Sequence, residues 1–336
     1  MRGLGSRRMK FPLVLLACGI CLSAAPRRKD SSAPALPAFD ANAINDSGQS
    51  SPVGPGDKGS AVVRAQILLD RAHFSGGEID GEFGANMQKT VAAFQRANNL
   101  QASGAVDAQT WAVLNRDQAP PLFPYTITQE DLKGPFVKLP SDMMQQATLP
   151  YLGYESPLDE LAEKFHASPS LLKALNPGAS FDKEGEIITV PNVLVAPPGE
   201  AASIVVSKSD SSVTALDPNG KTLAYYVATI GSEHDPLPIG DWKINGVAHN
   251  PVFHYNPALF WDANPKDQKA EIKAGPRNPV GVVWIDLSKE HYGIHGTPYP
   301  AKIGHTESHG CIRLTNWDAL ELSQMVKPGT PAKLED

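Results

Sequence analysis

The spacing of apolar residues changes along this 336-residue chain, and the change divides it into units of different secondary structure. Between Gly59 and Asn115, apolar side chains recur at helical intervals, as in Met87, Val91 and Phe94. From residue 200 onward they occur in short runs rich in β-branched and aromatic residues, separated by turn residues, which predicts strands. A chain of this length can bury more than one core, so we predict a multidomain α+β protein.

The first residues predict export. Residues 1–24 have the pattern of a secretory signal peptide, with basic residues ahead of an apolar stretch and Ser23-Ala24-Ala25 as the cleavage site. Leu15-Leu16-Ala17-Cys18 also resembles a bacterial lipoprotein signal, so a lipid anchor through Cys18 stays open. We expect an exported protein of the periplasm or cell envelope. Without its first 24 residues the chain has 26 Lys and Arg against 36 Asp and Glu, which argues against a nucleic-acid partner.

Composition places the boundaries of the first domain. Residues 25–57 are rich in Pro, Ser, Ala and Asn, which predicts a disordered linker. Residues 58–117 predict a small domain of three short helices, the last of them capped by Asp107. Residues 118–149 are expected to be a second linker.

A second small unit follows this linker. Residues 150–195 predict two helices and then a strand. Ser156 and Ser168 each stand as a cap before a proline that starts a helix, and residues 187–190 form the expected strand.

The C-terminal part, residues 200–335, predicts a mainly-β domain. Asp217-Pro218-Asn219-Gly220 has the composition of a hairpin turn between two strand-like runs. One helix is expected late in this domain, beginning at Thr315 or Asn316.

Cys311 is the only cysteine that remains once residues 1–24 are removed. A lone thiol forms no internal disulfide, so in an exported protein it points to thiol chemistry, and His295 and His309 are candidate bases nearby. The N–H groups of Gly310 and Cys311 could form an oxyanion hole, because a glycine lets the backbone approach a substrate carbonyl. The same residues could instead bind zinc, but no further cysteine is present, so we expect no metal and no cofactor.

At this point a resemblance to a known family becomes specific. The run from His295-Gly296-Thr297 through Ser308-His309-Gly310-Cys311-Ile312-Arg313 to Asn316 resembles the signature of the YkuD-type L,D-transpeptidases. Pro238-Ile239-Gly240 and the run from Gly275 to Gly281 are similar to two further family segments, so the resemblance covers residues 202–334. It implies a β-sandwich catalytic domain.

The activity that the resemblance implies is acyl transfer on peptidoglycan. Cys311 would attack the bond between diaminopimelate and D-Ala of a tetrapeptide stem, form an acyl thioester, and pass the acyl group to an amine acceptor. His295 would be the general base, and the Gly296 carbonyl would orient its ring. The resemblance implies that a carbapenem acylates Cys311. The expected substrate-binding residues are Ser308, His309, Arg313 and Asn316.

The two N-terminal units resemble wall-binding families. Residues 58–117 are similar to the peptidoglycan-binding domain through Ile79-Asp80-Gly81, Phe83-Gly84 and Thr110-Trp111, and some members of that family only dock onto a partner domain. We expect this domain to tether the enzyme, so its deletion should spare activity on small soluble muropeptides. Residues 150–195 resemble a LysM module at Leu175-Asn176-Pro177 and in the run from Gly185 to Pro191, although its opening strand is missing from the sequence.

Peptidoglycan stem peptides and glycan strands are the partners that these resemblances imply. A LysM module would bind glycan, and the alternative for residues 150–195 is a spacer. Water in place of the amine would give an L,D-carboxypeptidase. A different peptidoglycan amidohydrolase of the NlpC/P60 type would carry its cysteine before its histidines, whereas here His295 precedes Cys311. A non-enzymatic wall-binding scaffold is disfavoured, because the residues that acyl transfer needs are intact.

Overall fold

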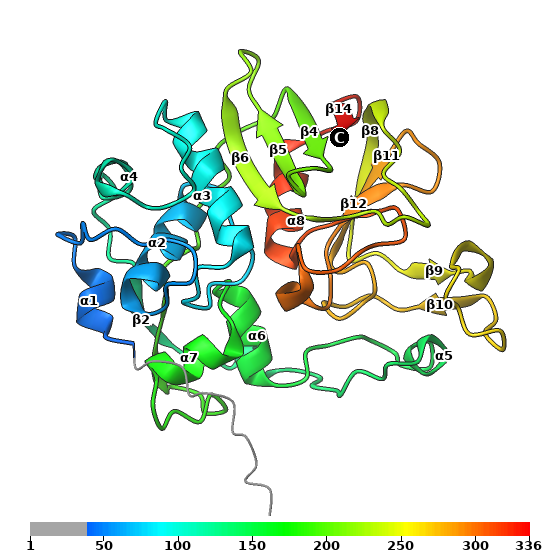
Figure 1. Cartoon of the computed structure of the whole chain (residues 1–336). Coiled ribbons are helices and arrows are strands. Elements are labelled where there is room, and N and C mark those ends of the chain that lie inside the picture. Colours follow the sequence, from blue (N-terminus) through cyan, green and yellow to red (C-terminus); the bar gives the residue numbers. More distant parts are fainter. Residues whose placement is uncertain (1–38) are drawn as a thin grey trace, which may run out of the picture. The chain divides into compact units, whose positions relative to one another are not determined.

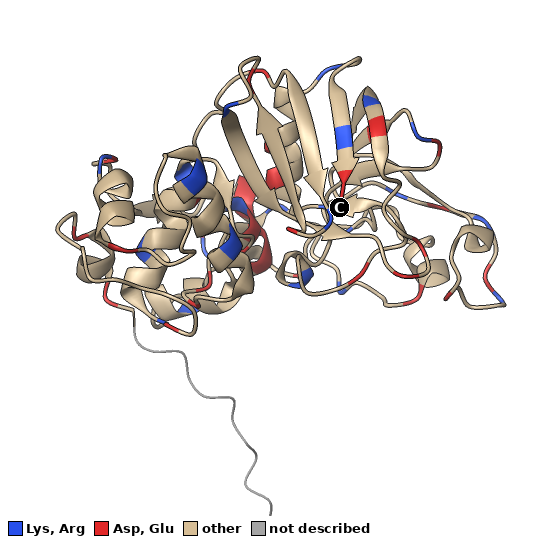
Figure 2. Ribbon diagram, turned by 45° about the horizontal axis from the view of Figure 1, so that its top comes forward, with Lys and Arg blue, Asp and Glu red and all other residues tan. Residues whose placement is uncertain are grey.

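The computed structural model describes residues 39–336 (Figure 1). The expected signal peptide 1–24, with Cys18, and residues 25–38 of the first predicted linker lie outside the described residues. Among the residues that are described, no helix combines the length and the apolar character needed to cross a bilayer. Lys and Arg are interspersed with Asp and Glu along this part of the ribbon (Figure 2), unlike the clustered basic residues of nucleic-acid-binding domains.

Three helices build the N-terminal domain, as predicted: α2 (Ser60–Arg71), α3 (Ala85–Ala97) and α4 (Ala108–Leu114). The predicted cap of α4 is confirmed, because the Asp107 side chain accepts the N–H of Thr110. The core that the three helices share includes Val62, Leu68, Met87, Val91, Phe94 and Trp111.

The prediction of a disordered linker is wrong for residues 39–57. Helix α1 (Ala41–Asn45) buries Ile44 completely. Val53 pairs with Val106 in an isolated antiparallel bridge. The few apolar residues of this stretch are enough to fix it, because each of them enters a core that later residues build.

A short strand joins the helical domain to the C-terminal domain. Strand β1 (Phe74–Ser75) pairs in parallel with β6 (Thr222–Val227), with Phe74 opposite Tyr225. Side chains of the C-terminal domain, including Tyr225, Val227 and Ile303, are buried in the core of the helical domain. The helical domain is therefore docked on its neighbour through a continuous core.

The middle unit is larger than the sequence predicted. Strand β2 (Leu122–Thr126) pairs antiparallel with β3 (Ile187–Pro191), and α6 (Pro157–Lys164) and α7 (Pro169–Leu175) lie between them in the chain. We call residues 122–191 the middle unit. The predicted helices and closing strand are present, and Ser156 and Ser168 cap their helices as predicted.

The prediction that residues 118–149 are a linker is wrong. They contain β2, the single turn η1 (Glu130–Leu132) and the short helix α5 (Met143–Gln146). Strand β2 was not predicted from the sequence. It was overlooked because its central residue is Pro124, which only an edge strand accommodates, and because residues 127–156 separate it from α6.

The C-terminal domain carries most of one mixed sheet of ten strands, in the order β1-β6-β5-β4-β14-β8-β11-β12-β13-β7. Strand β8 (Gly240–His249) is shared, since its first half pairs with β14 and its second half with β11. The other strands are β4 (Ser203–Ser207), β5 (Ser212–Leu216), β7 (Thr229–Ile230), β11 (Val283–Leu287), β12 (Gly293–His295), β13 (Ile312–Arg313) and β14 (Pro331–Glu335).

Both halves of this sheet contribute to one core with the late helix. Helix α8 (Asn316–Met325) begins after the cap residue Thr315 and buries Ala319, Leu322 and Met325 among the strands. The structure thus differs from the predicted β-sandwich in one respect: the two halves are hydrogen-bonded into a single sheet through β8. A separate hairpin of β9 (Phe253–Tyr255) and β10 (Ala270–Ile272) extends from this domain (Figure 1).

Candidate active site

Two neighbouring strands carry the predicted base and lead from the predicted nucleophile. Strand β12 pairs in parallel with β13, with Ile294 opposite Ile312 and His295 opposite Arg313. Cys311 directly precedes β13. The prediction that His295 comes from a strand next to Cys311 is therefore confirmed.

The His295 ring is held on two sides. Its side chain is buried, with only 3% of the residue exposed, and the ring stacks on Trp284 at 5.4 Å between centroids. Its Nδ1 lies 2.7 Å from the carbonyl oxygen of Gly296. Because a carbonyl only accepts, Nδ1 carries the proton and Nε2 keeps its lone pair. Burial lowers the pKa of His295 to about 3, and the positive charge of Arg313 adds to this shift.

The pKa of Cys311 is shifted in the opposite direction, upward. Burial raises the pKa of its thiol, and the Arg313 guanidinium only partly offsets this effect. The thiol donates a long hydrogen bond of 3.8 Å to the His291 carbonyl. Within residues 39–336, no hydrogen bond joins Cys311 to His295. At neutral pH the resting site therefore contains a thiol and a neutral imidazole, and no thiolate–imidazolium pair.

The loop before Cys311 is shaped by a glycine. Gly310 has a φ of +91°, and a side chain there would place its Cβ 2.8 Å from the Tyr292 ring. Ser308 fixes the loop, since its Oγ donates to the Cys311 carbonyl at 2.6 Å and its N–H donates to the Gly231 carbonyl at 3.0 Å. In the described part of the chain, the N–H groups of Gly310 and Cys311 donate no hydrogen bond, so both are free to meet an oxyanion.

His309 faces a loop that the sequence did not associate with the site. Its Nε2 lies 2.8 Å from Asp262, and its ring packs against Phe260 and Trp261. Trp261 is 61% exposed and also contacts the ring of His234, at 4.6 Å between centroids. An exposed aromatic run in a polar loop was the available signal, but the pairing of this loop with His309 exists only in the folded chain.

The prediction that Asn316 contacts substrate is wrong. This residue is 1% exposed, and its amide is hydrogen-bonded within the protein. Its Nδ2 donates to Glu163 at 2.8 Å and to the Pro276 carbonyl at 3.0 Å, while its Oδ1 accepts the N–H of Val282. The side chain of Ser308 is likewise buried and bonded to the backbone, so it shapes the loop rather than facing a ligand. His309, Gly310, Cys311 and Arg313 remain together with His295.

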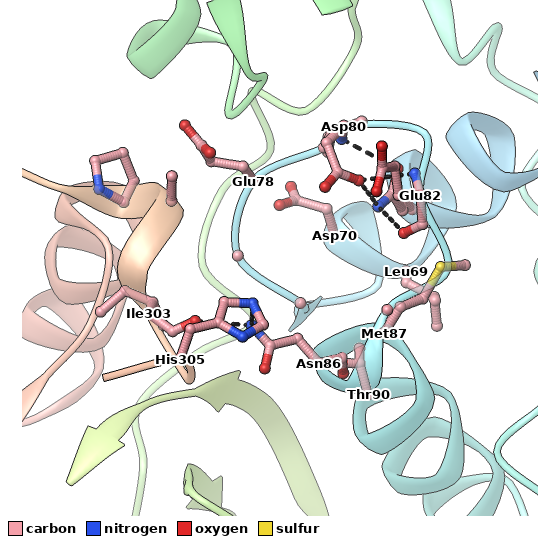
Figure 3. Close-up of a pocket in the computed structure, with 17 residues that line it drawn as sticks. Leu69, Asp70, Glu78, Asp80, Glu82, Asn86, Met87, Thr90, Ile303 and His305 are labelled. Carbon is pink, nitrogen blue, oxygen red and sulfur yellow. Dashed lines mark hydrogen bonds between the residues drawn. The ribbon is translucent and has the colours of Figure 1, made fainter. Parts of the chain in front are cut away.

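A separate cavity of about 200 Å³ lies between the helical domain and residues 300–305 (Figure 3). Asp70, Glu78 and Asp80 lie on one side of it, and Asn86 donates to the Ile303 carbonyl at 2.8 Å on the other. Burial raises the pKa of Glu78 to about 7, with the charge of Asp80 adding to the effect. None of the predicted site residues lines this cavity.

No three His, Cys, Asp or Glu side chains of residues 39–336 come together in a way that could hold a metal ion.

Comparison with known proteins identifies the families of two parts of the chain. Residues 201–334 match the family model of the YkuD L,D-transpeptidase catalytic domain, and residues 58–114 match that of a peptidoglycan binding domain. The Bacillus subtilis relative named as the L,D-transpeptidase YkuD is 31% identical over 174 residues, which cover 52% of this chain and 90% of the relative.

More distant relatives carry the same name. ErfK/SrfK of Escherichia coli, also named an L,D-transpeptidase, is 29% identical over 192 residues, which cover 54% of this chain and 59% of that protein. A crystal structure of an L,D-transpeptidase from Xylanimonas cellulosilytica aligns over 85% of this chain and 98% of its own, at 16% identity and a TM-score of 0.36. A TM-score this low supports no statement about the site.

Proposed function

Because the chain belongs to the YkuD family of L,D-transpeptidases, which are cysteine-dependent acyltransferases, we propose that Cys311 is its nucleophile and His295 its general base. The two matched families imply peptidoglycan as the substrate. We propose that the bond cleaved joins diaminopimelate to D-Ala in a tetrapeptide stem. The observation that carries the proposal is the strand pairing that sets His295 beside Arg313, two residues after the only thiol of residues 39–336.

The first half-reaction forms a thioester. Sγ of Cys311 attacks the carbonyl carbon of the third stem residue, and its proton passes to Nε2 of His295. The oxyanion is met by the free N–H groups of Gly310 and Cys311. The C–N bond to D-Ala then breaks, and the proton on Nε2 goes to the departing amino group. The opposite pKa shifts of the two residues disfavour a stable ion pair, so proton transfer accompanies C–S bond formation.

The second half-reaction releases the acyl group. An acceptor amine attacks the thioester carbon and loses a proton to Nε2 of His295, which returns a proton to Sγ as the C–S bond breaks. Arg313, whose guanidinium lies near the thiol, is suited to pair with a substrate carboxylate, and His309 lines the site. If water takes the place of the amine, the same steps give an L,D-carboxypeptidase.

One assay tests the proposal and separates its two outcomes. The protein is incubated with a disaccharide-tetrapeptide, with and without an amine acceptor, and the products are identified by mass spectrometry. We expect release of D-Ala and a cross-linked or amine-exchanged product. His295→Ala should slow D-Ala release at least about a hundredfold. Formation of a tripeptide alone, even with excess acceptor, would establish hydrolysis, and unchanged turnover in His295→Ala would exclude this base.

The N-terminal units support binding to the wall polymer. The strand, helix, helix, strand order of β2, α6, α7 and β3 is the order of a LysM module, which favours glycan binding by residues 122–191. A pull-down of the intact chain on isolated sacculi, with and without soluble glycan strands as competitor, measures this retention.

Export completes the proposal, since the substrate lies outside the cytoplasm. We propose two alternatives for the exported protein: cleavage after residue 24, or a lipid anchor on Cys18. The mass of the mature protein from its native host distinguishes them, and a retained Met1 would contradict both.

A further inference from the structure

A buried polar cluster connects the middle unit to the C-terminal domain. Glu163, on α6, is at its centre and is buried from solvent. Its Oε2 lies 3.0 Å from Nη1 of Arg277, and its Oε1 lies 2.8 Å from Nδ2 of Asn316. The Tyr154 hydroxyl donates to the same Oε1 at 3.1 Å. One carboxylate of the middle unit thus organises two side chains of the neighbouring domain.

Both of those side chains, Arg277 and Asn316, contact residues 296–298, the segment that follows His295. Nη1 of Arg277 donates to the Pro298 carbonyl at 2.8 Å, three residues after His295. Asn316 packs on Gly296 so closely that a Cβ at that glycine would lie 2.1 Å from Oδ1 of Asn316. The Gly296 carbonyl is the group that accepts Nδ1–H of His295. Two residues that Glu163 holds therefore contact the segment that carries this carbonyl: Asn316 packs on Gly296, and Arg277 binds the backbone at Pro298.

The charges in the cluster make Glu163 difficult to replace. Arg277 is buried, and besides Glu163 its guanidinium pairs with Asp159, a second α6 carboxylate that is partly exposed. Without the Glu163 carboxylate, Tyr154 loses its acceptor and Asn316 keeps only the Pro276 carbonyl. Arg277 keeps the Pro298 carbonyl, and its charge is then balanced only by Asp159, which is nearer to solvent. Because unsatisfied polar groups are costly in a buried network, loss of the carboxylate should loosen the contacts that Asn316 and Arg277 make.

We propose that Glu163 is a positioning residue for the reaction, acting through Asn316 and Arg277 on the Gly296 carbonyl and thereby on the orientation of His295. The inference rests on the proposed role of His295 as the general base. The middle unit is then part of the scaffold of the catalytic centre, and its role is more than that of a spacer or a wall-binding module.

The test compares Glu163→Gln with a matched control in the same unit. Asp131 is also a buried carboxylate, accepting from Tyr125 at 2.8 Å, from Thr128 at 2.7 Å and from Lys164 at 2.7 Å. Within residues 39–336, its side chain makes no hydrogen bond to the C-terminal domain. Asp131→Asn therefore disturbs the middle unit without touching the Asn316 and Arg277 pathway. The readouts are Tm, kcat, KM and the pH profile of kcat/KM on a soluble tetrapeptide.

We expect Glu163→Gln to lower kcat roughly ten- to hundredfold with little change in KM, because a displaced base costs rate rather than binding. In this variant the acid limb of the kcat/KM profile should move to higher pH, toward the ordinary histidine pKa, because a His295 ring that is free to move is less buried. Asp131→Asn should lower Tm and leave kcat and the limb in place. A wild-type kcat in Glu163→Gln, or the same kcat loss and limb shift in both variants, would overturn the proposal.

Two further outcomes are separable. If Glu163→Gln does not fold, Asp159→Asn takes its place, because it weakens the ion pair that holds Arg277 from the solvent side. It should lower kcat by a smaller factor and shift the acid limb of kcat/KM in the same direction. An unchanged kcat in Asp159→Asn would count against the inference. Failure of the proposed function would appear differently, as wild-type turnover that persists in His295→Ala.

Discussion

At the scale of single residues, the two reacting groups rest in their neutral forms. Burial moves the pKa of His295 down to about 3 and that of Cys311 up, so neither is charged near neutrality. The sequence identified both residues, because a lone thiol and its neighbouring histidines are local signals. It could not reveal the direction of their pKa shifts, which arise from burial in the folded domain, with Arg313 adding to the shift of His295 and opposing that of Cys311.

The pH profile should carry this signature. An imidazole with a depressed pKa stays a competent base as the pH falls, so kcat/KM should show no acid limb near the usual histidine value of about 6.5. The rate should fall only as the pH approaches about 3, the pKa of buried His295. Initial rates on a soluble tetrapeptide between about pH 4 and about pH 8 measure this. A half-maximal rate near pH 6.5 would contradict the account of His295.

Gly310 offers a second residue-scale prediction. Gly310→Ala forces an alanine into a left-handed backbone region and against the Tyr292 ring, so the loop that carries the oxyanion donors must shift. We expect kcat to fall about a hundredfold or more. Gly220→Ala is the matched control, because Gly220 also has a positive φ, of +78°, with nothing within 4 Å of its Cβ position. Equal losses of kcat in both variants would show that strain alone, and not the site, is responsible.

At the scale of elements, the helical domain is a structural neighbour of the catalytic sheet. Strand β1 extends the sheet, and Phe74 packs on Phe94 and Tyr225 at 5.3 Å and 6.4 Å between centroids. Deleting the helical domain is therefore no longer expected to leave activity on small soluble substrates intact. Removing residues 58–117 would expose Tyr225, Val227 and Ile303, so the remainder should lose stability together with wall binding.

A single substitution tests the docking more cleanly than a deletion. Phe74→Ala should lower the free energy of unfolding by about 3 kcal/mol, as is typical of a buried phenylalanine. Leu259→Ala, at a residue that is 53% exposed, is the control and should change it little. Urea unfolding measures both. A negligible effect of Phe74→Ala would mean that the helical domain is not held through β1.

Elements with strong local signals could be predicted, and those defined by partners could not. Asp107, Ser156 and Ser168 cap helices as expected because capping is a local interaction. Strand β2 escaped prediction because its pairing with β3 spans more than 60 residues of chain, from Thr126 to Ile187. The error at Asn316 has the same origin: its acceptor, Glu163, belongs to another unit.

At the scale of the whole molecule, ionisable groups gather where the three units meet. Asp318 of α8 accepts from Ser75 of β1 at 3.0 Å, and His166 of the middle unit bonds Asp70 of α2 and stacks on Trp317. Burial raises the pKa of Asp318 to about 8, with the charge of Asp70 adding to the shift. Folding therefore favours the protonated Asp318.

The raised pKa of Asp318 makes the folded protein less stable as the pH rises. A carboxyl whose pKa is raised in the folded state contributes fully below its unfolded value, and the contribution is lost as the pH rises to about 8. The free energy of unfolding should fall between about pH 4 and about pH 8, and Asp318→Asn should reduce that fall. Urea titrations of both proteins measure it. An identical fall in Asp318→Asn would show that Asp318 is not responsible.

The most direct test of the central claim is the location of the covalent intermediate. Cys311 is the only thiol of the described chain, and the account makes it the acylated group. Incubation with a carbapenem followed by intact-mass measurement and peptide mapping should give one adduct per chain, on Cys311, and none in Cys311→Ala, which should also fail to turn over a tetrapeptide. An adduct on another residue, or full activity in Cys311→Ala, would contradict the account.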